Sequence, residues 1–143
     1  HVDNLPAGVE ALQERLRAAE FELNRLRREQ LLAQAGTFLA EAEALPGGAR
    51  LIARFVEGDA MLLRELTSKL IEAPQVIALI GVMNGEQASY VFGRSADVSV
   101  NMGDLLRTAA RPHGGKGGGR PDFAQGGGSK EILSEACRIL REG

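Results

Sequence analysis

Apolar residues recur at heptad spacing through the first part of the chain. From residue 9 they follow alternating steps of three and four, and the positions between them are mostly charged. This spacing predicts one long helix of roughly 35 residues whose narrow apolar stripe needs a partner helix. The residues expected to form the stripe and support dimerisation are Val9, Leu12, Leu16, Leu23 and Leu26. Packing of this coiled-coil-like helix on its own globular domain is the alternative.

Leu45-Pro46-Gly47-Gly48 is the sharpest boundary in the sequence, because proline and two glycines cannot continue a helix. We therefore predict two parts, a helical dimerisation segment over residues 1–46 and a globular domain over residues 47–143. Gly36 offers a point where the long helix can bend.

The globular part alternates short apolar runs with helical periodicity. Residues 50–56 and 75–83 are predicted strands, and the amphipathic stretch between them is a predicted helix, so the two strands are expected to pair in parallel. Asn84-Gly85 predicts a hairpin into an antiparallel third strand. Helices are expected over residues 101–110 and from Ser129 onwards. The fold class is α+β (α/β): a long N-terminal helix followed by a small mixed-sheet domain.

Glycine dominates the segment from residue 114 to residue 128, where it occupies eight of fifteen positions. That density is unfavourable in a helix or strand interior, so we predict a Gly-rich loop over 114–128. Backbone N–H groups without neighbouring Cβ atoms can approach an anion, and Lys116 and Arg120 add positive charge. Arg120-Pro121-Asp122-Phe123 is unlike a flexible Gly/Ser linker, which favours an ordered phosphate-binding loop.

Charge is balanced over the whole chain but not locally. The net charge is −2, which argues against a general binder of polyanions. Between residues 107 and 130, however, five basic residues accompany one acidic residue. Any anion site is therefore expected to be local. The chain has no apolar run long enough for a membrane span and no signal peptide, so we expect a cytoplasmic protein without a membrane partner.

Known catalytic and nucleotide-binding patterns are absent from the sequence. Lys116 is followed by glycine where a P-loop needs serine or threonine, and the dinucleotide pattern lacks its third glycine. The single cysteine, Cys137, excludes an internal disulfide and a cysteine-based zinc site. No nucleophile with a base and no carboxylate pair has catalytic spacing. We expect this chain to be no enzyme by itself and to bind no cofactor.

The glycine-rich segment resembles a known motif. Residues 114–127, Gly-Gly-Lys-Gly-Gly-Gly-Arg-Pro-Asp-Phe-Ala-Gln-Gly-Gly, are similar to the signature near the C-terminus of alanyl-tRNA synthetases, in the DHH-associated domain. Phe123 and Gly126 depart mildly from the usual methionine and alanine. The order of long helix, proline-glycine break and glycine-rich α/β domain fits the C-terminal region of that family.

The resemblance implies a module that binds the elbow of tRNA(Ala), dimerises, and supports aminoacylation and editing. ATP, Mg and Zn would belong to the parent alanine–tRNA ligase. Two alternatives stay open, a pure oligomerisation module with a structural glycine loop, and the C-terminal domain of a free-standing alanyl-tRNA editing protein. DNA is a further partner that the sequence leaves open. The expected nucleic-acid-binding residues are Lys116, Arg120, Gly115, Gly117, Gly118, Gly119, His113, Arg94, Arg107, Arg111 and Lys130.

Overall fold

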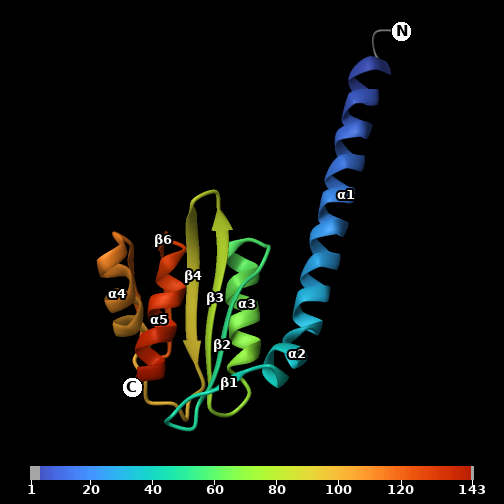
Figure 1. Ribbon diagram of the computed structural model, residues 1–143. Coiled ribbons are helices and arrows are strands. Elements are labelled where there is room, and N and C mark those ends of the chain that lie inside the picture. Colours follow the sequence, from blue (N-terminus) through green and yellow to red (C-terminus); the bar gives the residue numbers. More distant parts are fainter. Residues whose placement is uncertain (1–3, 143) are drawn as a thin grey trace. The chain divides into compact units, whose positions relative to one another are not determined.

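The computed structural model describes the backbone of residues 4–142 and the side chains of residues 11–142. Two compact units divide the chain between Ala33 and Gln34. The first unit is one helix, α1 (Asn4–Ala33), and the second contains all the remaining elements (Figure 1). The predicted long helix is confirmed, although the helix ends at Ala33 and a separate short helix, α2 (Ala35–Ala40), follows it.

The second unit is a six-stranded mixed sheet with helices on both faces. Its elements after α2 are β1 (Glu43–Ala44), β2 (Arg50–Phe55), α3 (Ala60–Leu70), β3 (Val76–Asn84), β4 (Gln87–Arg94), α4 (Met102–Ala110), the 3₁₀ turn η1 (Arg111–His113), β5 (Lys116–Gly119), β6 (Phe123–Ser129) and α5 (Glu131–Glu142). The strand order is β1-β2-β3-β4-β6-β5. The predicted α+β fold is therefore correct.

The predicted strand-helix-strand unit is β2-α3-β3, and its two strands pair in parallel. Central strand β3 is buried from Val76 to Val82, which explains its continuous apolar sequence. Asp59 caps α3 by accepting a 2.8 Å hydrogen bond from the backbone N–H of Leu62. The predicted hairpin is also present, since β3 and β4 are antiparallel and Gly85 adopts φ +68° between them.

The two faces of the sheet bury different helices. Tyr90 and Phe92 of β4 point to the face covered by α4 and α5, where they lie in one core cluster with Leu106 and Ile132. Helix α3 packs on β3 and β4 from the other face (Figure 1), where its Thr67 lies against Gly93. Because side chains alternate along each strand, neighbouring residues of a strand pack against different helices.

Candidate nucleic-acid interface

The glycine-rich segment is a pair of antiparallel strands. The prediction of a loop over 114–128 is wrong, because Lys116–Gly119 and Phe123–Ser129 form β5 and β6 at one edge of the sheet. Glycine composition favours a loop only when nothing else compensates its loss of backbone freedom. Here β6 gains a full ladder with β4 and another with β5, and both strands lie close beneath α4. Tertiary packing overrides local preference.

Alternate glycines on this hairpin have no room for a side chain. A Cβ at Gly117 would lie 2.6 Å from Cδ2 of Leu106, and one at Gly126 would lie 2.4 Å from the backbone oxygen of Lys116. Helix α5 imposes the same limit at Gly115, whose Cβ would lie 2.5 Å from Cδ1 of Ile132. Close packing of the helices on the strand therefore explains why Gly115 and Gly117 have no side chain, and no bound phosphate is needed to explain it.

Lys116 and Gly118 occupy the opposite face of the hairpin. In an antiparallel ladder, directly paired residues share a face, so Lys116 lies with Gly127, and Gly118 with Gln125. Lys116 and Gln125 are exposed, whereas Ala124, which points to the α4 side, is 1% exposed. Gly118 differs from Gly117 because a Cβ added at Gly118 would have one close neighbour, a side-chain nitrogen of Arg107 at 3.3 Å.

The remaining cations predicted for the site surround the hairpin. Arg120 follows β5 and is exposed, with its Nε 3.7 Å from Oδ1 of Asp122. Lys130 and Arg111 are exposed on the turns before α5 and after α4, and His113 is half-buried in η1. Gly119 ends β5 with φ +155°, a conformation that favours glycine. An exposed pair such as Arg120–Asp122 contributes little to stability, so the guanidinium stays available to an anion.

Arg94 has a different environment. Its Nε donates a 3.1 Å hydrogen bond to the backbone oxygen of Pro121, and its Nη1 donates a 3.1 Å bond to the oxygen of Ser95. The same Pro121 oxygen accepts from the N–H of Met102, at the start of α4. Arg94 thereby ties the end of β4 to the turn between β5 and β6, which favours its structural interpretation over a phosphate contact.

Arg107 lies on α4 and forms an exposed ion pair with Asp104 one turn earlier. Its guanidinium also reaches Gly118 on the edge strand. The helix is capped by Asn101, whose Oδ1 accepts a 3.0 Å hydrogen bond from the N–H of Asp104. Arg107 is therefore held close to the open side of the glycine hairpin.

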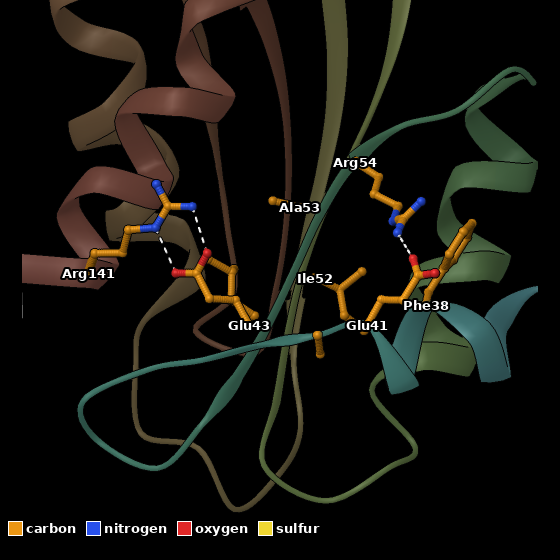
Figure 2. Close-up of a pocket in the computed structure, with 9 residues that line it drawn as sticks. Phe38, Glu41, Glu43, Ile52, Ala53, Arg54 and Arg141 are labelled. Atoms are coloured by element: carbon orange, nitrogen blue, oxygen red, sulfur yellow. Dashed lines mark hydrogen bonds and ion pairs between the residues drawn. The ribbon is translucent and has the colours of Figure 1, made fainter.

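A pocket of about 160 Å³ lies at the other edge of the sheet, beside β1 (Figure 2). Glu43 accepts two hydrogen bonds from Arg141, and Glu41 pairs with Arg54, whose guanidinium carbon is 4.6 Å from the ring centre of Phe38. Both arginines that line the pocket are matched by carboxylates. The pocket thus offers a balanced charge, unlike the glycine hairpin, and is not where the predicted residues gather.

Metal ligands do not cluster within the described residues, where no group of three or more histidine, cysteine, aspartate or glutamate side chains could hold an ion. Cys137 is buried against the α4 side of the sheet, and burial raises the pKa of its thiol. Over the same part of the chain, none of the helices combines the length and the apolar character needed to cross a membrane.

The apolar stripe of α1 is open to solvent in the single chain. Leu12, Leu16, Leu23 and Leu26 are each between 47% and 64% exposed. Val9 lies in α1, but its side chain is outside the described residues. Phe21, which lies off the heptad seam, is 70% exposed.

Residues 48–142 match the model of one protein family, described as the DHHA1 domain. The chain belongs to the DHHA1 domain family. The resemblance inferred from the glycine motif is thereby confirmed, and the glycine hairpin, α4 and α5 all fall within the matched DHHA1 region.

Relatives of this DHHA1 chain are alanine–tRNA ligases. It is 40% identical to the enzyme of Thermobifida fusca over 150 aligned residues, which include 98% of this chain and 17% of that protein. The chain thus spans about a sixth of the length of this relative. Among solved structures, it resembles the C-Ala domain of Aquifex aeolicus alanyl-tRNA synthetase, with 28% identity, a TM-score of 0.58, and coverage of 70% of this chain and 93% of that domain.

A second structural likeness concerns the fold alone. The chain resembles exonuclease RecJ, solved with manganese, with a TM-score of 0.60 and 19% identity, over 88% of this chain and 31% of that enzyme. The DHHA1 fold therefore occurs in proteins named for different activities, and function has to be argued from the site.

The structure adds two residues that sequence reasoning missed. Gln125 lies beside Gly118 on the exposed side of the DHHA1 hairpin, and Nη1 of Arg64 in α3 lies 3.5 Å from its Oε1. The signal for Gln125 was strand alternation, which is invisible once residues 114–128 are taken as a loop. The grouping of Lys116, Gln125, Arg64 and Arg107 can hold an extended anion, because it offers cations and an amide around bare backbone.

Proposed function

We propose that this chain is the non-catalytic C-terminal module of an alanine–tRNA ligase, that it binds tRNA(Ala) at its elbow, and that it self-associates through α1. The observation that carries the proposal is the likeness to a C-Ala domain over nearly the whole of that domain. Aminoacylation and editing belong to the rest of the parent enzyme, for which the module retains the tRNA.

The tRNA-binding part is supported by exposed cations at the glycine hairpin. Lys116 and Arg120 stand at the two ends of β5, and the residues between them are glycines. Contacts to phosphate and ribose would dominate, since proteins recognise folded RNA largely by its shape and its 2′-hydroxyls. Such contacts also give DNA some affinity, because backbone contacts carry little sequence information.

The decisive experiment measures binding of tRNA(Ala) and of a DNA duplex to the whole 143-residue chain across a salt series. Wild type is compared with the double variant Lys116→Ala/Arg120→Ala and with Lys69→Ala, which removes an exposed cation at the end of α3. We expect wild type to prefer tRNA, and the double variant to bind more weakly with a salt slope lower by about 2. Equal binding by wild type and the double variant would contradict the proposal.

Self-association is tested separately by the molecular mass of the chain in solution. An exposed leucine stripe at heptad spacing supports a helix-helix contact between two copies. Leu16→Ser/Leu23→Ser should shift the chain toward the monomer, whereas Phe21→Ser, which removes an exposed apolar side chain off the seam, should not. The opposite pattern would indicate that α1 uses its other side.

A pure oligomerisation module is the second candidate, and one observation favours it. Gly115, Gly117 and Gly126 are each explained by close packing of the hairpin with neighbouring backbone or with α4 and α5, without any ligand. In that case the chain binds tRNA no more tightly than DNA, while the leucine substitutions still dissociate the dimer into monomers. A free-standing editing protein as the parent would leave both experiments unchanged, and the length of the parent chain distinguishes it.

A further inference from the structure

One part of the sheet in the 34–142 unit has no helix over it. Helix α3 packs on β3 and β4, while α4 packs on β5 and β6 from the opposite face. The side of β5 and β6 that faces away from α4 therefore extends beyond α3. The burial of successive residues shows this, since Ala124 is 1% exposed whereas the next residue, Gln125, is open to solvent.

Polar groups cross this surface in a row. Arg64, on α3, has its Nη1 3.5 Å from Oε1 of Gln125. Gln125 pairs with Gly118 on the edge strand. Nη1 of Arg107 would lie 3.3 Å from a Cβ added at Gly118, so the guanidinium of Arg107 is also close to this residue. We call Arg64, Gln125, Gly118 and Arg107 the open-face row. Lys116 lies on the same face, two residues before Gly118 along β5.

We propose that the open-face row carries the sugar-phosphate backbone of the bound RNA, with Arg64 and Gln125 as binding residues additional to those on the hairpin. This inference rests on the proposed function and names the surface that the RNA would use. The RNA would run over Gly118, with Arg64 on one side of it and Arg107 on the other.

The chemistry of the row favours a sugar-phosphate backbone over other ligands. Arginines at both ends can each donate paired hydrogen bonds to a phosphate, and the Gln125 amide offers a donor and an acceptor to a ribose hydroxyl. Gly118 has no side chain between them, so the sugar-phosphate backbone of the RNA can lie flat across β5. Protein-protein interfaces instead concentrate apolar and aromatic side chains at their centres, which the row lacks.

The pairing of its arginines also distinguishes this surface from the cavity beside β1. The cavity beside β1 lies at the opposite edge of the sheet, and its arginines are already paired with Glu41 and Glu43. On the open-face row, Arg107 pairs with Asp104 in an exposed ion pair, whereas Arg64 faces the neutral amide of Gln125, so the row keeps one arginine opposite no carboxylate among its own members. Charge complementarity therefore points to a polyanion lying across the strands.

Two variants test the row, and one of them alters no charge. Arg64→Ala removes a cation from the row, and Gly118→Val places a branched side chain where only the flexible end of Arg107 lies nearby. Both are assayed in the whole 143-residue chain against a tRNA(Ala) transcript and a tRNA of different sequence. Lys69→Ala is the matched control on the same helix as Arg64. Thermal melting checks that each variant is folded.

We expect Arg64→Ala and Gly118→Val each to weaken binding of both tRNAs by about tenfold and to the same extent, because backbone contacts are independent of sequence. Lys69→Ala should leave binding unchanged. If Gly118→Val fails to fold, Arg64→Ala decides alone.

The inference is overturned, and the proposed function kept, if Lys116→Ala/Arg120→Ala weakens tRNA binding while Arg64→Ala and folded Gly118→Val do not. If wild type binds tRNA no more tightly than the DNA duplex, both the proposed function and this inference are wrong. A change in oligomeric mass with unchanged RNA binding would assign the face to a protein contact and would also overturn the inference.

Discussion

Arg141 in the last turn of α5 donates two hydrogen bonds, from Nε at 2.7 Å and from Nη2 at 2.8 Å, to the carboxylate of Glu43 in β1. The two residues are 98 positions apart in sequence, and their pair joins the first strand of the 34–142 unit to its last helix (Figure 2). This geometry is the forked arrangement in which arginine binds carboxylate best.

Loss of the Glu43–Arg141 pair should lower the stability of the unit near neutral pH and should have no effect on its stability in acid. Arg141 holds the pKa of Glu43 below its ordinary value, so the carboxylate stabilises the fold above that value and ceases to do so as the pH falls through the lowered pKa. Glu43→Gln should lower the melting temperature by a few degrees at most at pH 7, because the pair is exposed. The difference from wild type should shrink as the pH falls below the ordinary glutamate pKa and through the lowered pKa of Glu43. Glu72→Gln is the exposed control, and an unchanged difference in acid would contradict the assignment.

Tyr90 gives a direct optical test of the core. It is the only tyrosine and the chain has no tryptophan. Burial raises its pKa to about 12, and its hydroxyl donates a 2.7 Å hydrogen bond to the backbone oxygen of Ser129. The folded state therefore prefers the neutral phenol, and this preference costs stability as the pH rises above the ordinary tyrosine pKa of about 10. The ultraviolet absorbance of the phenolate should appear near pH 12 in the folded chain and near pH 10 in denaturant. Coincident titrations would mean that Tyr90 is accessible.

An added methyl group should destabilise one side of the glycine hairpin and leave the other almost unaffected. A Cβ at Gly117 would lie 2.6 Å from Cδ2 and 2.7 Å from Cγ of the buried Leu106, so Gly117→Ala pushes α4 away from the strand. We expect it to lower the free energy of unfolding by about 1–3 kcal/mol. Gly118→Ala meets only the end of Arg107 and should change stability by less than about 0.5 kcal/mol. Denaturant unfolding measures both, and equal losses would mean that the two faces do not differ as described.

Ser95 is a buried polar residue that holds the crossing between α3 and β3. Its Oγ accepts a 2.9 Å hydrogen bond from the N–H of Val76 and donates to the backbone oxygen of Ala73. Ser95→Ala leaves both backbone groups without these bonds and should cost about 1–3 kcal/mol of unfolding free energy. Ser68→Ala, an exposed serine on α3, should be close to neutral. A neutral Ser95→Ala would show that water or another group replaces the hydroxyl.

Most elements could be predicted because their own sequence carries the signal. The apolar run from Val76 to Val82 can only be a buried segment, and Asp59 and Asn101 mark the starts of their helices. The strands β5 and β6 could not be predicted in this way, because their glycines carry no local signal and the strands are held by the ladders with β4 and with each other and by packing under α4. For the same reason Gln125 and Arg64 were missed, since only the folded sheet brings them together.

The ion pair between Glu43 and Arg141 has a consequence for how such a unit can be combined with other domains. A fold whose first strand and last helix are held together presents its entry and exit close to one another. It can be attached to an unrelated partner, or inserted within one, without a long connecting segment and without disturbing its own interior. The same fold occurs in a synthetase domain and in an exonuclease.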